Sequence, residues 1–331
     1  MSKAIQTHYL PKKAYLSFFT KPGARTIYMY QRDQPPIELT IENAGRERNL
    51  YCYRDAEGNL NSDVEKWFER LESGAYPTLG TLNEALEDFD LSLEDWRKVS
   101  EFLAAQLLRT PAWRRKLEEM YGATAKAFMM KMASDDRSWD SINREAPSKF
   151  PDMDLGKLRR FVLSGEYDMN MTGGAAYFLS NIVKCWEIAA RSFFFRNPIL
   201  LRTKEQEAFV TSDSPVLMVR HPKSPDYMGT GVINSKFLVP IGSARALYLG
   251  VPLGLKEGAL CERERVRVKV ANIGRARLRA FNALTIRNAE RFVFAAFKSR
   301  RIAELFALTK KPQRFKIQSP PNLPFIMVRS E

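Results

Sequence analysis

Apolar residues along the middle of the chain recur every three or four positions, which is the period of an amphipathic helix. Three such stretches open on residues that suit a helix N-terminus, either a serine with an acidic residue three positions later or a proline. These opening residues are Ser62, Ser92 and Pro111. Similar patterns predict two more helices over residues 155–163 and 175–195.

Towards both ends of the chain the pattern changes to short β-branched and aromatic runs separated by Gly and Pro, which is typical of strands. Near the N-terminus these runs cover residues 26–31, 37–41 and 49–53. In the second half they cover residues 199–203, 208–212, 216–220, 237–241 and 246–251. A helical stripe returns over residues 270–296.

Together these patterns predict an α+β fold, predominantly helical, in which helices flank a small mixed or antiparallel sheet. The sheet would take strands from both ends of the chain, so we expect residues 1–331 to form a single domain. The polar, broken stretch 135–152 is the best candidate for a linker. It would separate a part with the N-terminal strands and helices, residues 1–134, from a part with the small sheet and basic C-terminal helices, residues 153–331.

Positive charge is concentrated near the C-terminal end. The formal net charge is +14, and residues 263–316 hold 16 Lys or Arg against 3 Glu. Residues 61–104 are acidic instead, with 11 Asp or Glu against 4 Lys or Arg. Because a localised positive field attracts polyanions, we expect DNA or RNA to bind through the 263–316 segment. The alternative is a solvated basic face on a soluble protein.

Several classes of protein are excluded by what the sequence lacks. It has no apolar leader and no run as long as a membrane span, so we expect a cytoplasmic protein without membrane contact. The three cysteines, Cys52, Cys185 and Cys261, are far apart and are expected to be reduced. With only His8 and His221, a zinc site built on several histidines is ruled out. No phosphate-binding loop, GxSxG elbow or kinase motif is present.

Two motifs in the first part of the chain could supply acid–base or metal chemistry. His8 stands in His8-Tyr9-Leu10-Pro11 and can exchange a proton near neutral pH, or it can simply anchor the N-terminal arm. Glu65 and Glu72 are two helical turns apart, so they share a face and could bind a divalent cation. The alternative is that Glu65 caps its helix and Glu72 is solvated.

Two later motifs allow a structural as well as a functional interpretation. Gln106 and Arg109 share one helix face, where the guanidinium could grip phosphate or pair with a helix-borne glutamate. Asp213 follows an apolar strand, which is a common catalytic or metal-binding position, but it also suits a tight turn in which Asp accepts backbone amides. Asn282 and Asn288 lie near the last helical stripe and imply a polar network if they are buried.

These segments together resemble a widespread, mainly bacterial family of unknown function. Its members open with His-Tyr-x-Pro-x-x-Tyr-Leu, which appears here as HYLPKKAYL with one extra residue between Pro11 and Tyr15. The other matching positions are Val64-Glu65, Glu72, Gln106-Leu107-Leu108-Arg109-Thr110-Pro111, Thr211 to Val216, an altered Pro240-Ile241-Gly242-Ser243, and Asn282 to Ala289. The resemblance implies that these motifs fold into one unit, and it brings no established activity.

Our leading hypothesis is a metal-dependent or His-assisted phosphodiesterase, a nuclease, which would fit a role in bacterial defence. His8 and Asp213 would be catalytic, and Mg²⁺ or Mn²⁺ would be held by Glu65, Glu72 and Asp213. The substrate would be bound by Tyr9, Gln106, Arg109, Arg275 and Arg279. Two alternatives remain open: a non-catalytic nucleic-acid-binding or regulatory protein, and an enzyme acting on a small anionic metabolite.

Overall fold

The computed structural model describes residues 6–54, 57, 60–149, 154–169, 175–204, 208–219, 236–252, 264–309, 315–318 and 326–329. The chain divides into two compact units. Unit 1 comprises Met1–Arg114 and Gly174–Pro312, and unit 2 comprises Arg115–Gly173 and Gln313–Glu331. The chain therefore leaves unit 1 after Arg114 and returns to it at Gly174.

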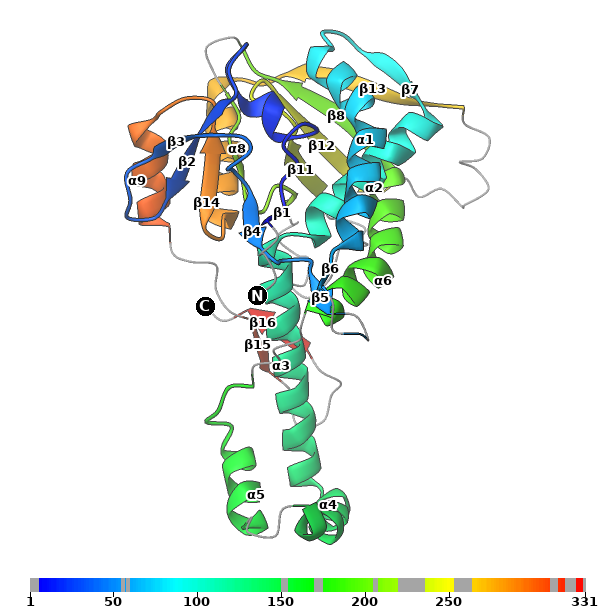
Figure 1. Cartoon of the computed structure of the whole chain (residues 1–331), viewed down its shortest axis with the longest axis vertical. Helices are drawn as coiled ribbons and strands as arrows, with labels where there is room; N and C mark the ends of the chain where they lie inside the picture. Colours follow the sequence, from blue (N-terminus) through cyan, green and yellow to red (C-terminus); the bar gives the residue numbers. More distant parts are fainter. Residues whose placement is uncertain are drawn as a thin grey trace. The chain divides into compact units, whose positions relative to one another are not determined.

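The larger sheet of unit 1 has six strands in the order β10-β11-β12-β8-β13-β7 (Figure 1). Their bounds are Leu217–Val219, Lys236–Pro240, Arg245–Pro252, Arg196–Arg202, Arg265–Asn272 and Phe89–Ser92. All neighbouring pairs are antiparallel except β13 and β8, which run parallel. Apolar side chains of one face, including Leu201 and Ala246, pack against Leu278 of helix α8 (Arg275–Asn288).

A second sheet of unit 1 is antiparallel and has the order β3-β2-β14-β9. Its strands are Ile37–Thr40, Thr26–Gln31, Phe292–Ala295 and Thr211–Ser212. Tyr30 and Val293 of this sheet pack with Phe306 of helix α9 (Arg300–Leu308). Two short pairs complete the unit: β1 (Gln6–His8) with β4 (Arg46–Arg48), and β5 (Tyr53–Arg54) with β6 (Leu60–Asn61).

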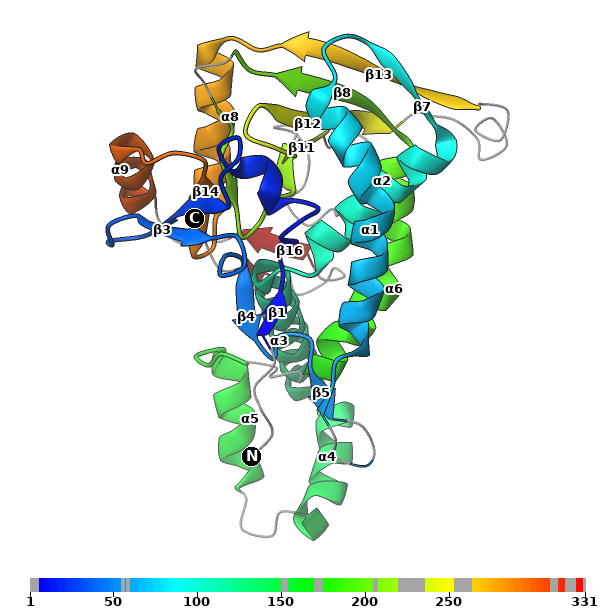
Figure 2. The ribbon, with the colours of Figure 1, turned by 45° about the horizontal axis from the view of Figure 1, so that its top comes forward.

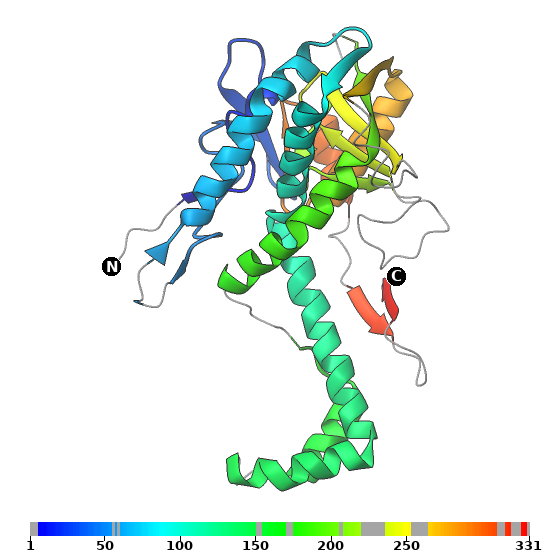
Figure 3. The same cartoon turned by 90° about the vertical axis from the view of Figure 1, so that its right-hand side faces the viewer.

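Three helices of unit 1 lie side by side, as Figure 3 shows: α1 (Asp63–Glu84), α2 (Leu93–Leu108) and α6 (Ala175–Phe194). Helix α2 is buried along most of its length, because Trp96, Val99 and Phe102 recur at helical spacing and are inaccessible to solvent. Its start is fixed by Ser92, whose side chain accepts from the Asp95 backbone N–H at 3.0 Å. Residues Leu16–Phe19 form a short 3₁₀ turn.

Unit 2 contains most of helix α3 (Pro111–Ser134), helices α4 (Asp136–Lys149) and α5 (Leu155–Ser164), and the strand pair β15 (Phe315–Gln318) and β16 (Ile326–Arg329). Its small core consists of Ala133, Trp139 and Val162. The chain reverses after α5 at Gly165, whose positive φ of 67° suits glycine. Lys126 Nζ holds this turn by donating to the carbonyls of Gly165 and Tyr167 at 2.6 and 2.5 Å.

The described residues form eight α-helices and several sheets. The α+β class is therefore confirmed, but the strands form several sheets rather than the one small sheet expected. Within the stretch expected to be a linker, residues 136–149 form α4, whose Trp139 and Ile142 supply a short apolar face. The predicted strand over 49–53 is mostly a turn, with Asn49 at a positive φ of 52°. No helix in the described part of the chain is long and apolar enough to cross a membrane.

The predicted helix over 270–296 was also wrong at both ends. Residues 265–272 form β13 and residues 292–295 form β14, so only α8 between them is helical. The alternation of Arg265-Val266-Arg267-Val268 has the period of a strand, and Val268 is buried against the sheet while both arginines are exposed. Gly274 is the N-cap that separates this strand from α8.

Candidate functional site

Arg109 lies at the centre of a buried polar cluster that gathers several motifs of unit 1. Its side chain is fully buried at the end of α2. Nε donates to the Tyr9 carbonyl at 2.9 Å, and Nη1 forms an ion pair with Glu72 of α1 at 2.7 Å. With its amide oxygen facing the guanidinium, Gln106 accepts from Nη2 at 2.8 Å. The ion pair with Glu72 is the structural alternative that the sequence left open, and it leaves Arg109 positioning the site rather than facing solvent.

The start of the chain reaches the later motifs through two tyrosines. The Tyr15 hydroxyl lies 2.7 Å from Thr211 Oγ1 and donates to the Pro240 carbonyl at 2.7 Å. Burial raises the pKa of the Tyr9 hydroxyl, which lies near Asp213 and beside Arg291. Arg291 in turn pairs with Glu47. Segments about 200 residues apart in sequence are thereby joined in one network.

Asp213 serves as an acceptor for the backbone. Its Oδ1 accepts from the Glu290 N–H at 2.8 Å, and its Oδ2 accepts from Arg291 and Phe292 at 2.7 and 3.0 Å. The side chain is fully buried, and this burial raises its pKa to about 6. The three amides lower the pKa, because they stabilise the ionised carboxylate, but their effect is smaller than that of burial. Asp213 therefore accepts backbone amides as the structural interpretation expected, but these belong to Glu290, Arg291 and Phe292 at the start of β14 rather than to neighbours in a tight turn.

The predicted site residues on helix α8 either bond a neighbouring segment of the chain or are exposed. Asn282 accepts from the Val210 N–H at 3.1 Å and donates to the Ala208 carbonyl at 2.9 Å, so it joins α8 to the strand before Asp213. Asn288 is exposed and donates to Leu284 of its own helix. Arg275 and Arg279 are exposed on α8.

Glu65 is the carboxylate of this cluster without a structural role. The helix N-cap Ser62 makes no side-chain bond, so the capping interaction expected for Glu65 does not form. Within the described residues its Oε1 is buried and has no hydrogen-bond partner. Burial raises the pKa of Glu65 to about 7, with Arg109 lowering it and Glu72 raising it. Such a carboxyl group can both give and take a proton at neutral pH.

His8 faces the same cations as Glu65. It is half-buried, and its Nε2 lies 3.1 Å from the Glu42 carbonyl, which requires Nε2 to donate the proton. Burial lowers the pKa of His8, and the charges of Lys12, Arg46 and Arg109 lower it further. The charges of Arg109 and Lys12 thus lower the pKa of both His8 and Glu65. His8 is thus neutral at pH 7, and its Nδ1 carries the free lone pair.

Two exposed cations adjoin His8. Arg46 of β4 is the cross-strand partner of His8 in β1, and Lys12 follows four residues after His8. Within the part of the chain that the structure describes, neither cation forms an ion pair. Sequence reasoning missed both, since Arg46 lies in no motif and only the neighbourhood of HYLP could have drawn attention to Lys12.

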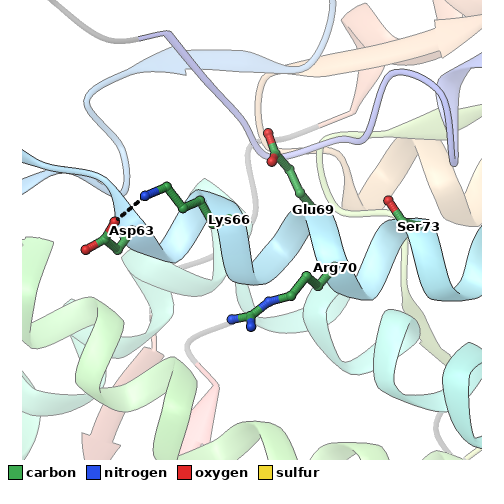
Figure 4. A pocket seen from close by; sticks show the side chains of 5 residues that line it. All are labelled: Asp63, Lys66, Glu69, Arg70 and Ser73. Atoms are coloured by element: carbon green, nitrogen blue, oxygen red, sulfur yellow. Dashed lines mark hydrogen bonds and ion pairs between the residues drawn. The ribbon is translucent and has the colours of Figure 1, made fainter.

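The exposed side of α1 carries no buried, unpaired carboxylate of this kind among the described residues. Figure 4 shows a shallow open depression along the helix, with an Asp63–Lys66 ion pair at 3.0 Å. Its lining residues are Asp63, Lys66, Glu69, Arg70 and Ser73. Charges of both signs on one exposed helix face are typical of a solvated surface.

The predicted metal ligands are not gathered. Among the described residues, no three His, Cys, Asp or Glu side chains lie together in a way that could hold an ion. Glu72 is committed to Arg109 and Asp213 to backbone amides, which explains why Glu65, Glu72 and Asp213 do not form one site. Cys52 and Cys185 are free thiols, while Cys261 and His221 lie outside the described residues.

We expect Glu65→Gln to stabilise the protein above pH 7 by about 2 kcal/mol, a figure reduced from the full pKa shift because the side chain is partly exposed. The folded pKa lies above the ordinary value of 4.5, so the native protein loses stability as pH rises from about 4.5 to about 7. Urea unfolding at pH 4, 6 and 8 would measure the difference. Glu84→Gln, an exposed carboxylate in the last turn of α1 that does not act on Glu65, is the control without such pH dependence. A difference between Glu65→Gln and wild type that is constant from pH 4 to 8 would contradict the assignment.

The chain matches the family described as "Protein of unknown function (DUF4238)" over residues 6–299. It therefore belongs to the DUF4238 family, whose match includes every motif of the cluster from His8 to Asn288. No curated protein and no solved structure shows significant similarity to it. The predicted membership of a family of unknown function is confirmed, and the family brings no activity with it.

Proposed function

We propose that this protein is a phosphodiesterase that cleaves nucleic acid, with His8 and Glu65 as its acid–base pair. One observation carries the proposal: Glu65 has a buried carboxylate oxygen without a partner, close to the same cations as a neutral histidine. Burying a carboxylate without a hydrogen bond costs stability, which is typical of groups retained for chemistry.

The two groups have complementary proton states for hydrolysis. His8 Nδ1 takes a proton from water, the resulting hydroxide attacks phosphorus, and the bond from phosphorus to the leaving sugar oxygen breaks. The protonated Glu65 carboxyl gives its proton to that oxygen, so the products are a phosphate monoester and an alcohol. Lys12 and Arg46 would balance the charge of the phosphodiester. Arg109 and Glu72 would hold the cluster in place without touching substrate.

Nucleic acid is favoured as the substrate by a second group of exposed cations. They are Arg265, Arg267 and Lys269 of β13, and Arg275, Arg277, Arg279 and Arg287 of α8. Asp88 and Asp90 partly neutralise Arg267, whereas α8 has no acidic residue at all. Figures 1 and 2 show β13 and the start of α8 at the end of unit 1 away from β1 and β4, whereas the end of α8 leads to Arg291, which pairs with Glu47 of β4. A ligand that contacts both groups must be long, as a polynucleotide is.

The test is cleavage of labelled single- and double-stranded DNA and RNA, with Mg²⁺, with Mn²⁺ and with chelator. We expect His8→Ala and Glu65→Gln each to lower the cleavage rate by about 100-fold or more. Glu84→Gln should cleave like wild type, because Glu84 is exposed in the last turn of α1 and does not act on Glu65.

A non-catalytic nucleic-acid-binding protein is the second candidate, and the engagement of Arg109 and Asp213 in structural bonds favours it. Salt-sensitive binding of all four substrates, without cleavage and unchanged in His8→Ala, would replace the phosphodiesterase proposal with this one.

A further inference from the structure

Two arginines face each other across neighbouring strands at one end of the large sheet. Arg245, the first residue of β12, is the cross-strand partner of Arg202, the last residue of β8. Directly opposed residues of an antiparallel pair project from the same face of the sheet, and like charges at such positions repel. The same face carries the buried Leu200 and Leu247, so this face of the sheet is covered, as is the face that packs on α8.

Neither arginine is neutralised within the described residues. Arg245 is only 5% exposed, and no carboxylate forms an ion pair with it or with the half-buried Arg202. Nη2 of Arg245 donates to the Ala85 carbonyl at 3.0 Å and Nη1 to the Ala244 carbonyl at 3.2 Å, while Nε is buried without an acceptor. Burial lowers the pKa of Arg245 and the charge of Arg202 lowers it further. Arg109 provides the contrast, since its buried guanidinium has Glu72.

Helix capping explains only part of this arrangement. Ala85 is the C-cap of α1, a helix whose last turn has no basic residue, so the Arg245 cation is well placed for the helix dipole. That role uses one nitrogen of Arg245. It gives no reason for a second arginine directly opposite, and it leaves Nε without a partner.

A third donor extends the row. Asn272, the last residue of β13, is the parallel partner of Arg202, so Arg245, Arg202 and Asn272 lie in register on three adjacent strands (Figure 2). Asn272 is exposed, and its side chain makes no hydrogen bond within the described part of the chain. Guanidinium groups match the oxygens of a phosphate in a two-pronged way, and an amide adds a further donor.

We propose that Arg202 and Arg245, with Asn272 at their side, form a binding site for a phosphate group. A bound phosphate removes the repulsion between the two arginines by supplying the negative charge that the described residues do not provide there. The phosphate is either free or part of a nucleic-acid backbone. The site is distinct from His8 and Glu65 and does not depend on the proposed catalytic function.

The site is tested by thermal unfolding of the full chain in increasing inorganic phosphate, at ionic strength held constant with NaCl. We expect the melting temperature of wild type to rise saturably, by roughly 2–4 °C at ten times Kd. Arg202→Gln should lose this saturable rise. Arg300→Gln, an exposed arginine paired with Glu304 on α9, should keep it and correct for the general stabilisation by excluded salts.

A second readout separates a binding role from a structural one. In phosphate-free buffer Arg202→Gln should melt at the same temperature as wild type or higher, because the substitution removes a like-charge contact. A lower melting temperature there, or an equal response of wild type and Arg202→Gln to both phosphate and a short oligonucleotide, overturns the proposal. If the oligonucleotide stabilises wild type but not Arg202→Gln, and free phosphate stabilises neither, the site binds the phosphates of a nucleic-acid backbone.

Discussion

Replacing Arg109 with methionine should lower the free energy of unfolding by about 3–5 kcal/mol, because the change breaks a buried ion pair by removing one partner. Three acceptors lose their donor at once: the Tyr9 carbonyl, the Glu72 carboxylate and the Gln106 amide. Glu72 is 23% exposed, so water can satisfy part of it, whereas Tyr9 and Gln106 are buried. Urea unfolding followed by tryptophan fluorescence would measure the loss.

Arg97→Met is the matched control. Arg97 also lies on α2, but it is half-exposed and pairs with Glu94 and Glu101 in solvent, so its loss should cost no more than about 1 kcal/mol. If Arg109→Met were as stable as Arg97→Met, the guanidinium would not hold the cluster together. That result would favour the alternative interpretation, in which the Arg109 guanidinium binds a phosphate group of the substrate.

Local signals in the sequence predicted most of the helices. Ser92 with Asp95, and Pro111 after Arg109-Thr110, mark helix starts that depend only on neighbouring residues. The long apolar stripe that became α6 needs no distant partner to be recognised. These features are encoded within a few turns of chain, so one sequence suffices to find them.

The arrangement of the strands in sheets could be predicted less well from the sequence, because paired strands lie far apart along the chain. β9 and β14, 80 residues from each other, pair in one sheet, and β14 continues to β2 near the N-terminus. The sequence predicted a strand over residues 208–212, but nothing local indicates that only Thr211–Ser212 form β9 or that they pair with β14. The alternation in β13 was visible, but the apolar stripe of α8 that follows it hid the boundary at Gly274.

In the candidate site, too, the sequence indicates which residues are of interest but not which side chains they contact. The motifs named His8, Glu65, Arg109 and Asp213, and the structure brings their segments into one unit. Their roles depend on what each side chain meets: Arg109 meets Glu72, while Glu65 meets no donor among the described residues. Burial and partnership, not residue type, separate the acid–base candidates from the structural ones.

Asp213→Ala should destabilise the protein by about 3–6 kcal/mol. The substitution leaves three backbone N–H groups, those of Glu290, Arg291 and Phe292, buried without an acceptor, and each unsatisfied donor costs about 1–3 kcal/mol. The lost bonds also join the loop before β14 to β9, so the second sheet should loosen. Asp63→Ala, which removes an exposed carboxylate on α1, should cost less than about 0.5 kcal/mol. Urea unfolding of the two variants beside wild type would measure both values.

This expectation changes how an activity assay must be designed. If Asp213→Ala is inactive and also unfolded by several kcal/mol, its inactivity says nothing about catalysis, because the variant fails through the loop that it no longer holds. Glu65→Gln and His8→Ala are the more informative variants. Glu65 Oε1 has no hydrogen-bond partner among the described residues, and His8 bonds one backbone carbonyl, that of Glu42, whereas Asp213 accepts from three backbone amides. The decisive contrary result is an Asp213→Ala protein within 1 kcal/mol of wild type that has lost cleavage. Asp213 would then act on the substrate, and the three amide bonds would be positioning a catalytic carboxylate.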